Sequence, residues 1–486
     1  MIKQRVMKKM RQLPGHSDYY RRTLSRTSCL FMKSSFHCFG MRNLLSLILL
    51  LLCWMGYLVP ACMASKHELA ISINEFAFDL YRVAGKISPE NNIFLSPFSI
   101  STVMSMVYLG SKGETSKQMS RTLKTENMSN IIHEKFEEYI KLINAENANF
   151  TLTTANRLYP SAGKEILDEY VTMCFKHYKT DVVPADYAKK ASDVEKEINS
   201  WVEKETRGKI KDLLPSGSLG PLTVLVLVNA IYFKGDWEKK FKPEDTVIQP
   251  FYKLDGDLVM VHIMKSLMKG AKYSHDPDLC CKALQLPYKG EDLYMLVLLP
   301  DKKDGLPALE SKLSVKRLEH LQNHMPHRLV EVSLPKFKIE ASFELSEALS
   351  KLGMPDAFDE SKADFSGMRK QNDVYLSKVF HKAFVEVNEE GTEAAAATAG
   401  IMMLKSTPVV HSFDANHPFL FLIMDKRSRV ILFQGRLADP NAVETKQGYE
   451  VLYQEKDDAA TSYILLYHYT LLCIFLEYLL THFCTV

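Results

Sequence analysis

Residues 223–233 read Thr-Val-Leu-Val-Leu-Val-Asn-Ala-Ile-Tyr-Phe, and only Asn229 interrupts the apolar run that Val224 begins. The run is short and rich in β-branched and aromatic residues, which favours a strand over a helix. Because polar and apolar residues do not alternate, we expect this strand to be buried on both faces. Residues 292–299 form a second such run, which Pro300 stops.

Amphipathic helices are predicted on either side of the first strand. Residues 65–68, Ser-Lys-His-Glu, have the form of a capping box, and apolar residues then recur at helical spacing until Gly85. A second helix ends at Gly208, and its apolar residues are Val194, Ile198, Trp201 and Val202. Residues 419–424 and 430–433 flank Asp-Lys-Arg-Ser, which predicts a hairpin. No repeat or linker divides residues 65–440, so this span is predicted to be one large α+β domain.

Composition and charge exclude several classes of protein. The 486 residues are 46% hydrophobic and 24% charged, unlike a largely disordered, collagen-like or polytopic membrane protein. The formal charge of +3 is uneven, because residues 1–64 hold ten Lys or Arg and one acidic residue. The tail, residues 441–486, carries −4, which leaves −2 for residues 65–440. The body therefore gives no argument for nucleic-acid binding.

Residues 41–64 have the pattern of a secretory signal peptide. Met-Arg-Asn precedes an apolar run over 44–59, and Ala-Cys-Met-Ala ends the segment at Ala64. The run is shorter than the roughly 20 residues of a membrane span, which favours a cleaved signal over a retained anchor. Residues 1–40 are basic and Ser-rich, as in a transit peptide, or they lie upstream of a true start at Met41. The protein is therefore expected to be secreted.

The C-terminal extension, residues 441–486, ends in an apolar segment from 463 onward that contains Glu477. A carboxylate inside a span is unfavourable, so a membrane anchor is a weak prediction. A glycolipid-anchor signal fits poorly, and a non-native or alternatively spliced tail is equally consistent with the sequence. In the body, Asn127 and Asn149 stand in glycosylation sequons.

The usual catalytic motifs are absent from the sequence. It has no Gly-x-Ser-x-Gly, His-Glu-x-x-His, Cys-x-x-Cys or phosphate-binding glycine loop, so neither an enzyme nor a metal or organic cofactor is predicted. Residues 65–440 hold three cysteines, of which Cys280 and Cys281 are adjacent. Neighbouring Cα atoms lie about 3.8 Å apart, too close for an ordinary disulfide.

The most unusual stretch is 389–400, Glu-Glu-Gly-Thr-Glu-Ala-Ala-Ala-Ala-Thr-Ala-Gly. Alanine favours a helix, so one interpretation is a short surface helix or a flexible linker. A run without bulky side chains can also enter a sheet as a strand. With a period of two, Thr392 and Ala394 would then share one face while Glu393 points to the other, solvated face.

Several motifs together resemble one known family. They are residues 92–99 (Asn-Ile-Phe-Leu-Ser-Pro-Phe-Ser), 227–237 (Leu-Val-Asn-Ala-Ile-Tyr-Phe-Lys-Gly-Asp-Trp), 334–337 (Leu-Pro-Lys-Phe), 382–387 (Lys-Ala-Phe-Val-Glu-Val), 391–395 (Gly-Thr-Glu-Ala-Ala) and 417–421 (His-Pro-Phe-Leu-Phe). In order and spacing along the whole domain, they resemble the serpins, a family of serine protease inhibitors. The resemblance implies three β-sheets, eight to nine helices and an exposed reactive loop.

The resemblance also implies where a target protease would cut. In inhibitory members the scissile bond follows the seventeenth residue counted from the first hinge residue, here Glu389, which gives Lys405–Ser406. Lys405 is also the only Lys or Arg between Lys382 and Lys426. A basic residue suits trypsin-like proteases, whose specificity pocket holds an aspartate. The alternative is a solvated loop lysine. The implied hinge comprises Glu389, Gly391, Thr392, Glu393, Ala394, Ala395, Ala396 and Ala397.

The implied mechanism is that of a suicide substrate: the protease is acylated at Lys405, and the loop then inserts into the main sheet before deacylation. Conformational roles fall on a second group of residues, by their match to the family. A polar cluster comprises Ser96, Ser99, Asn229 and His381; an ion pair joins Lys336 and Glu389; Trp237 packs nearby. Serine and histidine together also suggest a hydrolase, but the serines lack a nucleophile elbow.

Partners and competing functions follow from the same features. The leading partner is a trypsin-like serine protease in a covalent complex, with the inhibitor a monomer. Lys112, Lys117, Arg121 and Lys124 are a candidate glycosaminoglycan site, although such a run is more often a solvated face. The alternative function is a non-inhibitory serpin, a carrier or chaperone, possibly membrane-tethered. Small hinge residues argue against it.

Overall fold

The computed structural model describes residues 68–87, 89–144, 150–390, 409–442 and 444–447. Within them the predicted α+β fold is confirmed. A helix spans 68–87, and the further helices are α4 (Pro97–Leu109), α5 (Gly113–Thr122), α6 (Ile132–Ile143), α7 (Asp168–Tyr178), α8 (Tyr187–Glu205), α9 (Leu306–Lys312), α10 (Val315–Asn323) and α11 (Ser346–Leu352). This agrees with the expected eight to nine helices. Short 3-10 turns lie at η1 (Glu126–Met128), η2 (Pro243–Asp245) and η3 (Pro355–Phe358).

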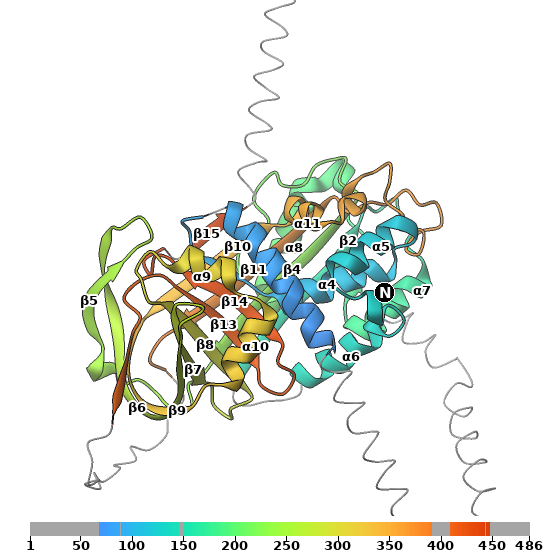
Figure 1. The fold of residues 1–486 in the computed structure, drawn as a ribbon. Coiled ribbons are helices and arrows are strands. Elements are labelled where there is room, and N and C mark those ends of the chain that lie inside the picture. The colour runs from blue at the N-terminus through green and yellow to red at the C-terminus, as the bar shows by residue number, and fades with distance from the viewer. Residues whose placement is uncertain (1–67, 88, 145–149, 391–408, 443, 448–486) are drawn as a thin grey trace, which may run out of the picture. The chain divides into compact units, whose positions relative to one another are not determined.

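One sheet contains six described strands and lies at the centre of Figure 1. In spatial order they are β15 (Glu444–Gln447), β10 (Phe337–Glu344), β11 (Lys378–Val387), β4 (Leu225–Gly235), β2 (Phe150–Pro160) and β3 (Asp181–Val182). β11 and β4 run parallel to each other, while each is antiparallel to its outer neighbour, β10 or β2. A strand of reversed direction inserted between β4 and β11 would therefore be antiparallel to both of its neighbours.

The other sheet contains nine described strands. They are β1 (Ile93–Leu95), β14 (Ile431–Leu437), β13 (Phe419–Asp425), β8 (Leu293–Pro300), β7 (Cys281–Pro287), β6 (Leu258–Asp276), β9 (His327–Pro335) and β12 (Val410–Asp414), with β5 (Val247–Tyr252) also paired to β6. Three separate sheets were expected. The described strands form two, because the 19-residue β6 pairs with β5, β7 and β9 and continues through a register shift between Lys269 and Ala271.

The β4 strand is buried on both faces, as its apolar run predicts: residues 225–233 are all buried. Its odd-numbered apolar residues join the main core, which also holds α4, while Val226, Val228 and Tyr232 pack against α8. On the outer side, Trp201 of α8 lies under the Arg157 guanidinium of β2, 3.9 Å from ring centroid to Cζ. The six-stranded sheet is thus covered by helices on both sides.

The predicted helices and strands are of the correct type, but their first and last residues differ from those in the structure. The helix over 68–87 continues two residues past Gly85, where the sequence predicted its end. β11 begins at Lys378, five residues before the predicted Ala383, because it pairs with β4 from that point. The terminal hairpin is confirmed, with β13 and β14 antiparallel.

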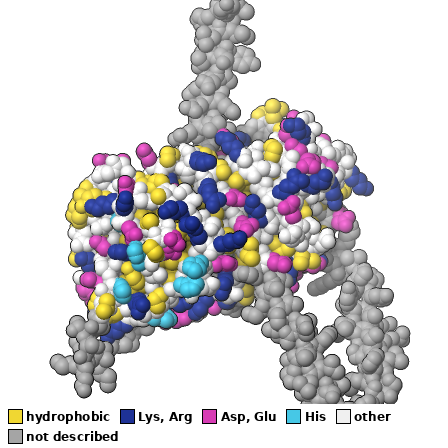
Figure 2. All heavy atoms as spheres, viewed as in Figure 1, with side chains coloured by type: hydrophobic (Ala, Val, Ile, Leu, Met, Phe, Trp, Pro, Cys, Tyr) yellow, Lys and Arg dark blue, Asp and Glu magenta, His cyan; other side chains and the backbone are white. Residues whose placement is uncertain are grey.

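The surface of the body mixes both signs of charge. Figure 2 shows acidic and basic side chains interspersed over the visible face, with hydrophobic ones gathered at the edge that β5 forms. Exposed apolar residues there include Ile248, Leu258 and Met260. Among the described residues no helix is long and apolar enough to cross a membrane, and both apolar ends of the chain fall outside this description.

Candidate functional site

The candidate site is the junction between the six-stranded sheet and residues 391–408. The hinge residues Gly391–Ala397 and the predicted reactive bond Lys405–Ser406 lie outside the described residues. Their attachments are described. β11 ends at Val387, and the chain re-enters a sheet at β12, which begins at Val410 and pairs in parallel with β9. The strand before residues 391–408 and the strand after them therefore belong to two different sheets.

The ladder between β4 and β11 would have to part if this segment entered the sheet. It runs from the pair Lys378–Val226 to the pair Val385–Phe233. At its middle, His381 lies opposite Asn229, and on the far side of β4 Asn229 lies opposite Asn156 of β2. A line of polar side chains therefore crosses three strands of an otherwise apolar sheet.

The four residues predicted as a polar cluster do come together. Asn229 Nδ2 donates to Ser99 Oγ and to Asn156 Oδ1, and Asn229 Oδ1 faces His381 Nδ1. Ser96 is the N-cap of α4: its Oγ accepts from the Ser99 backbone N–H at 3.2 Å and donates to Leu432 O of β14 at 2.7 Å. The cluster therefore ties β4 and β11 to α4 and β14 beneath them.

The hydrogen bonds define the tautomer of His381. The Ser96 backbone N–H lies 3.2 Å from His381 Nε2, so Nε2 accepts and Nδ1 carries the proton donated to Asn229 Oδ1. Burial lowers the pKa of His381 to about 3. A second proton would have to sit on Nε2, against the Ser96 N–H. The imidazole is thus held neutral as a link between strand and helix.

This geometry also excludes the hydrolase interpretation. Ser96 and Ser99 are buried, and His381 meets the backbone of Ser96 instead of a serine Oγ. The far side of the imidazole faces an amide, Asn229, where a triad needs a carboxylate. The cluster is therefore structural.

Glu389 is the last buried residue before the segment outside the description. Its carboxylate is 2.7 Å from Lys336 Nζ, as predicted, and it also accepts from Thr246 Oγ1 at 2.7 Å. Burial acts to raise the pKa of Glu389, but the Lys336 ammonium and the Thr246 hydroxyl lower it overall. The Lys336 backbone N–H in turn donates to His262 O of β6, so the carboxylate joins the end of β11 to the other sheet.

Trp237 supports the same junction. Its Nε1–H donates to the carbonyl of Asn388 at 2.9 Å, one residue before Glu389. The indole is stacked on Tyr288, with 4.6 Å between ring centroids and 9° between planes. The position of Trp237 near Lys336 and Glu389 agrees with the sequence prediction.

The candidate glycosaminoglycan residues are exposed on and around α5, but three of the four already meet carboxylates. Lys117 lies 3.3 Å from Glu114, and Arg121 lies 3.6 Å from Glu114 and from Glu126. Lys124 lies 2.9 Å from Asp79. Lys112, the N-cap of α5, is exposed. The local positive field is therefore weaker than the four basic residues suggest.

The glycosylation and cysteine predictions have mixed outcomes. Asn127 is exposed in η1, whereas Asn149 lies outside the described residues. Cys174, Cys280 and Cys281 are all free thiols, so the adjacent pair is not bridged. Burial raises the pKa of Cys174 and that of Cys281 to about 12, which makes both thiols unreactive.

Sequence reasoning missed two members of the site. Asn156 completes the polar line across the sheet, and Thr246 is the second partner of Glu389. An asparagine in the middle of the strand-like stretch 150–160 was a usable signal for the first. Nothing local marks Thr246, since it lies 143 residues from its partner.

Comparison with known proteins gives a consistent result. The family model of the serpins (serine protease inhibitor) matches residues 71–440. The human leukocyte elastase inhibitor is 43% identical over 382 residues, which are 77% of this chain and 100% of that protein. The leukocyte elastase inhibitor of Xenopus tropicalis is 42% identical over 379 residues, with the same coverage.

Solved structures agree with the sequence relatives. Uncleaved ovalbumin superposes with a TM-score of 0.72 at 33% identity and covers 77% of this chain and 100% of its own. An Arabidopsis serpin in its native stressed conformation gives a TM-score of 0.71 at 33% identity, covering 77% of this chain and 98% of its own.

Proposed function

Because this chain belongs to the serpin family of serine protease inhibitors, we propose that it traps a trypsin-like protease at the bond between Lys405 and Ser406. It acts as a protease inhibitor and not as an enzyme. The observation that supports insertion is the pairing of β4 with β11. These neighbours are parallel, and the hinge follows directly from the carboxyl end of β11. A segment that turns back there is antiparallel to both, and antiparallel pairing is slightly more stable per residue.

The chemistry begins as an ordinary proteolytic attack. The protease serine Oγ adds to the Lys405 carbonyl carbon, the bond to the Ser406 nitrogen breaks, and the protease histidine protonates the leaving amine. The ester that remains joins the protease to the new carboxyl end of the loop. Water would release it if the protease kept its catalytic geometry.

Insertion of the loop then distorts the catalytic geometry of the protease. β11 has ten residues, about 33 Å at roughly 3.3 Å per residue. Residues 392–405 are enough chain to run the length of β11 after a turn at 390–391. Lys405 would therefore move from one end of the sheet to the other and carry the ester-linked protease with it. Distortion of the triad and oxyanion hole leaves the ester unhydrolysed.

The test is to incubate the protein with trypsin and run the mixture on denaturing gels. We expect a band at the summed mass of inhibitor and protease, absent when trypsin is inactivated at its serine. Lys405→Glu should abolish the band, and Lys426→Glu, at an exposed lysine outside the loop, should not. Cleavage without a stable band, in the parent protein, would contradict the proposal.

A second target class deserves the same assay because of the relatives. Several are named as leukocyte elastase inhibitors. Elastase has a small specificity pocket, which suits an apolar side chain better than lysine. Residues 401–404, Ile-Met-Met-Leu, would then supply the cleaved bond. A complex with elastase that survives in Lys405→Glu would favour this alternative. Absence of a complex with either protease would favour a non-inhibitory carrier or chaperone, membrane-tethered if an apolar end is retained.

We further propose that residues 41–64 direct secretion and that Asn127 and Asn149 carry glycans. Expression in secretory cells should place the protein in the medium, with a mass that falls after N-glycosidase treatment. Asn127→Gln should remove one glycan, consistent with its exposure in η1. Glycosaminoglycan binding at Lys112, Lys117, Arg121 and Lys124 would appear as elution from heparin resin above physiological salt.

A further inference from the structure

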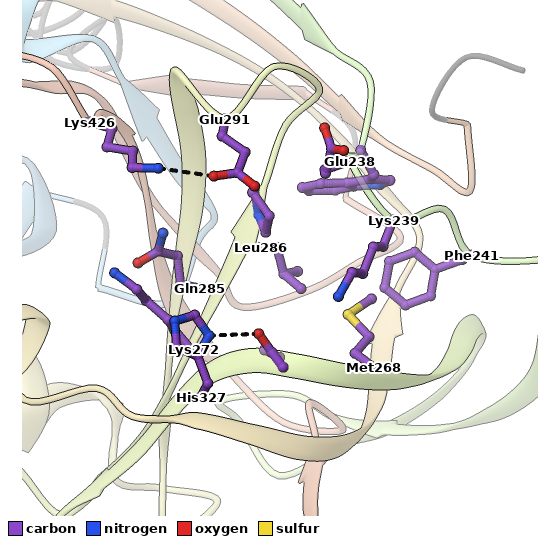
Figure 3. Close-up of a pocket in the computed structure, with 14 residues that line it drawn as sticks. Glu238, Lys239, Phe241, Met268, Lys272, Gln285, Leu286, Glu291, His327 and Lys426 are labelled. Carbon is purple, nitrogen blue, oxygen red and sulfur yellow. Dashed lines mark hydrogen bonds and ion pairs between the residues drawn. The ribbon is translucent and has the colours of Figure 1, made fainter. Parts of the chain in front are cut away.

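A cavity of about 240 Å³ lies beside Trp237, between the chain after β4 and the strands β6 and β7. Figure 3 shows Phe241 and Met268 on one side, Leu286 in the middle, and Lys272 and His327 on the opposite side. An apolar cavity of about 150 Å³ holds one benzene ring, so this space is large enough for a flat body of two fused rings.

One side of the cavity is mostly apolar, apart from Lys239. Trp237, Phe241, Met268 and Leu286 are all buried and contribute aromatic, thioether and aliphatic surface. Burying a two-ring body against such surface is favourable without any directional contact. This part of the lining contributes affinity but little selectivity between apolar ligands.

The opposite side carries the polar selectivity. Lys426 Nζ lies 3.0 Å from Glu291, and Lys239, which Figure 3 places beside Phe241 and Met268, donates from Nζ to the Lys269 carbonyl. Within the described part of the chain, the Lys272 ammonium has no hydrogen-bond or carboxylate partner. His327 donates from Nδ1 to Gly270 O at 2.8 Å, which leaves Nε2 available.

The acidic groups of the lining are already engaged. Glu291 is paired with Lys426, and Glu238 accepts from the Gly290 backbone N–H at 3.1 Å. No carboxylate of the lining therefore competes with an added anion for the Lys272 ammonium. From this arrangement we propose that the cavity binds a small amphipathic anion, a two-ring apolar body with one carboxylate, whose carboxylate pairs with Lys272.

Such a ligand would act on the hinge through Trp237. The indole forms part of the cavity wall, and its Nε1–H holds the Asn388 carbonyl next to Glu389. A ligand that packs on the indole binds best while that bond is intact. Because the ligand binds this state preferentially, it stabilises the state and opposes any change that displaces Trp237 from the hinge. This regulatory part rests on the proposed function, whereas the binding part does not.

The binding test uses 2-naphthoate and its neutral isostere 2-naphthamide, titrated by calorimetry into the full chain. We expect one site for the naphthoate and affinity lower by about tenfold or more for the amide, since one charge-assisted contact is lost. Lys272→Gln should reduce naphthoate affinity to that of the amide. Lys240→Gln, at a nearby lysine outside the cavity lining, should leave it unchanged. Equal affinity of the two probes, or an unchanged Lys272→Gln, would overturn the assignment.

Ala271→Met gives an independent check on location, because Ala271 lines the cavity and a longer side chain fills it. Both probes should then bind more weakly, with an unchanged melting temperature showing that the fold is intact. Undiminished binding of both probes by this folded variant would place the ligand elsewhere.

The regulatory test adds a synthetic peptide of residues 391–402 and follows its uptake into the sheet on native gels. Saturating naphthoate should slow uptake at least threefold in the parent protein and not in Lys272→Gln. Unchanged uptake despite measured binding would refute the link to the hinge. Binding that persists in a protein forming no protease complex would count against the proposed function and leave the cavity assignment standing.

Discussion

His381 of β11 and Asn229 of β4 lie directly opposite each other, and the imidazole Nδ1–H donates to the amide Oδ1 across the ladder. The two residues are 152 positions apart in sequence. Their bond closes the sheet at the middle of the boundary through which the hinge segment would enter. Any inserted strand must break it, so the pair connects the stability of the resting state to the inhibitory mechanism.

Replacing His381 should therefore destabilise the protein in a pH-dependent way. His381→Asn leaves the Ser96 N–H and Asn229 Oδ1 buried without their partner, at about 2–4 kcal/mol in the free energy of unfolding near pH 7.5. The folded-state pKa of about 3 lies below the unfolded value of 6.5. The unfolded chain thus binds the extra proton between these values, and parent stability falls by about 1.4 kcal/mol per pH unit as pH drops below 6.5.

The measurement is urea unfolding at pH 7.5 and pH 5. The stability gap between parent and His381→Asn should narrow at the lower pH, because the variant lacks the titrating imidazole. The control is His262→Asn, at an exposed histidine, and its free energy of unfolding should equal that of the parent at both pH values. A gap of equal size at both pH values would be incompatible with a neutral, buried His381.

The Glu389 carboxylate should slow premature entry of the hinge into the sheet. Glu389→Gln loses the ion pair with Lys336 and weakens the bond to Thr246, roughly 1–2 kcal/mol. We expect the variant to convert to an inactive, loop-inserted form about three- to tenfold faster at 45 °C, measured as loss of trypsin complex with time. Glu390→Gln, at an exposed carboxylate 4.0 Å from Lys234, should behave as the parent does.

Acid should mimic the Glu389 substitution. The folded-state pKa of Glu389 is lowered, so its contribution is present above the unfolded pKa and is lost as pH falls through the folded value. Conversion of the parent should accelerate in that acidic range, while Glu389→Gln changes less there. If the parent and Glu389→Gln convert at the same rate at neutral pH, the Glu389 carboxylate does not slow entry of the hinge into the sheet.

A change of charge at Thr392 should turn the inhibitor into a substrate. With a strand period of two, Thr392 would face the core after insertion and an arginine there would be buried without a partner. Thr392→Arg should be cleaved by trypsin without a stable complex. Glu393→Arg points to the opposite face and should keep complex formation. The readout is the ratio of complex to cleaved inhibitor, and a Thr392→Arg protein that still formed the complex would refute insertion in this register.

The short β15 strand gives a fourth prediction. Residues 444–447 pair in parallel with β10, from Glu340–Glu444 to Phe343–Gln447, and cover the edge of the six-stranded sheet. Truncation after Ala442 should lower stability by about 1 kcal/mol for each ladder hydrogen bond lost. It should also promote self-association, because it exposes an unpaired strand edge. Truncation after Gln447 is the matched control. Size-exclusion chromatography that finds the two truncations equally monomeric would rule out an edge-covering role.

Much of the fold was predictable because local patterns report local environments. The unbroken apolar run over 224–233 required burial on both faces, and α8 and the main core supply it. The terminal hairpin and the α-helical segments follow from spacing and turn residues in the same way. The absence of bulky side chains in 391–399 likewise shows in the sequence which segment is suited to enter a sheet.

The contacts that govern the sheet were decided by the tertiary structure. His381 meets Asn229 and Ser96, Glu389 meets Thr246, and Lys124 is neutralised by Asp79, all across long sequence separations. Propensity and periodicity act over a few residues, whereas these partners are selected by the global arrangement of strands. A buried polar group must find a partner somewhere, and only the assembled fold determines which group lies within hydrogen-bonding distance of it.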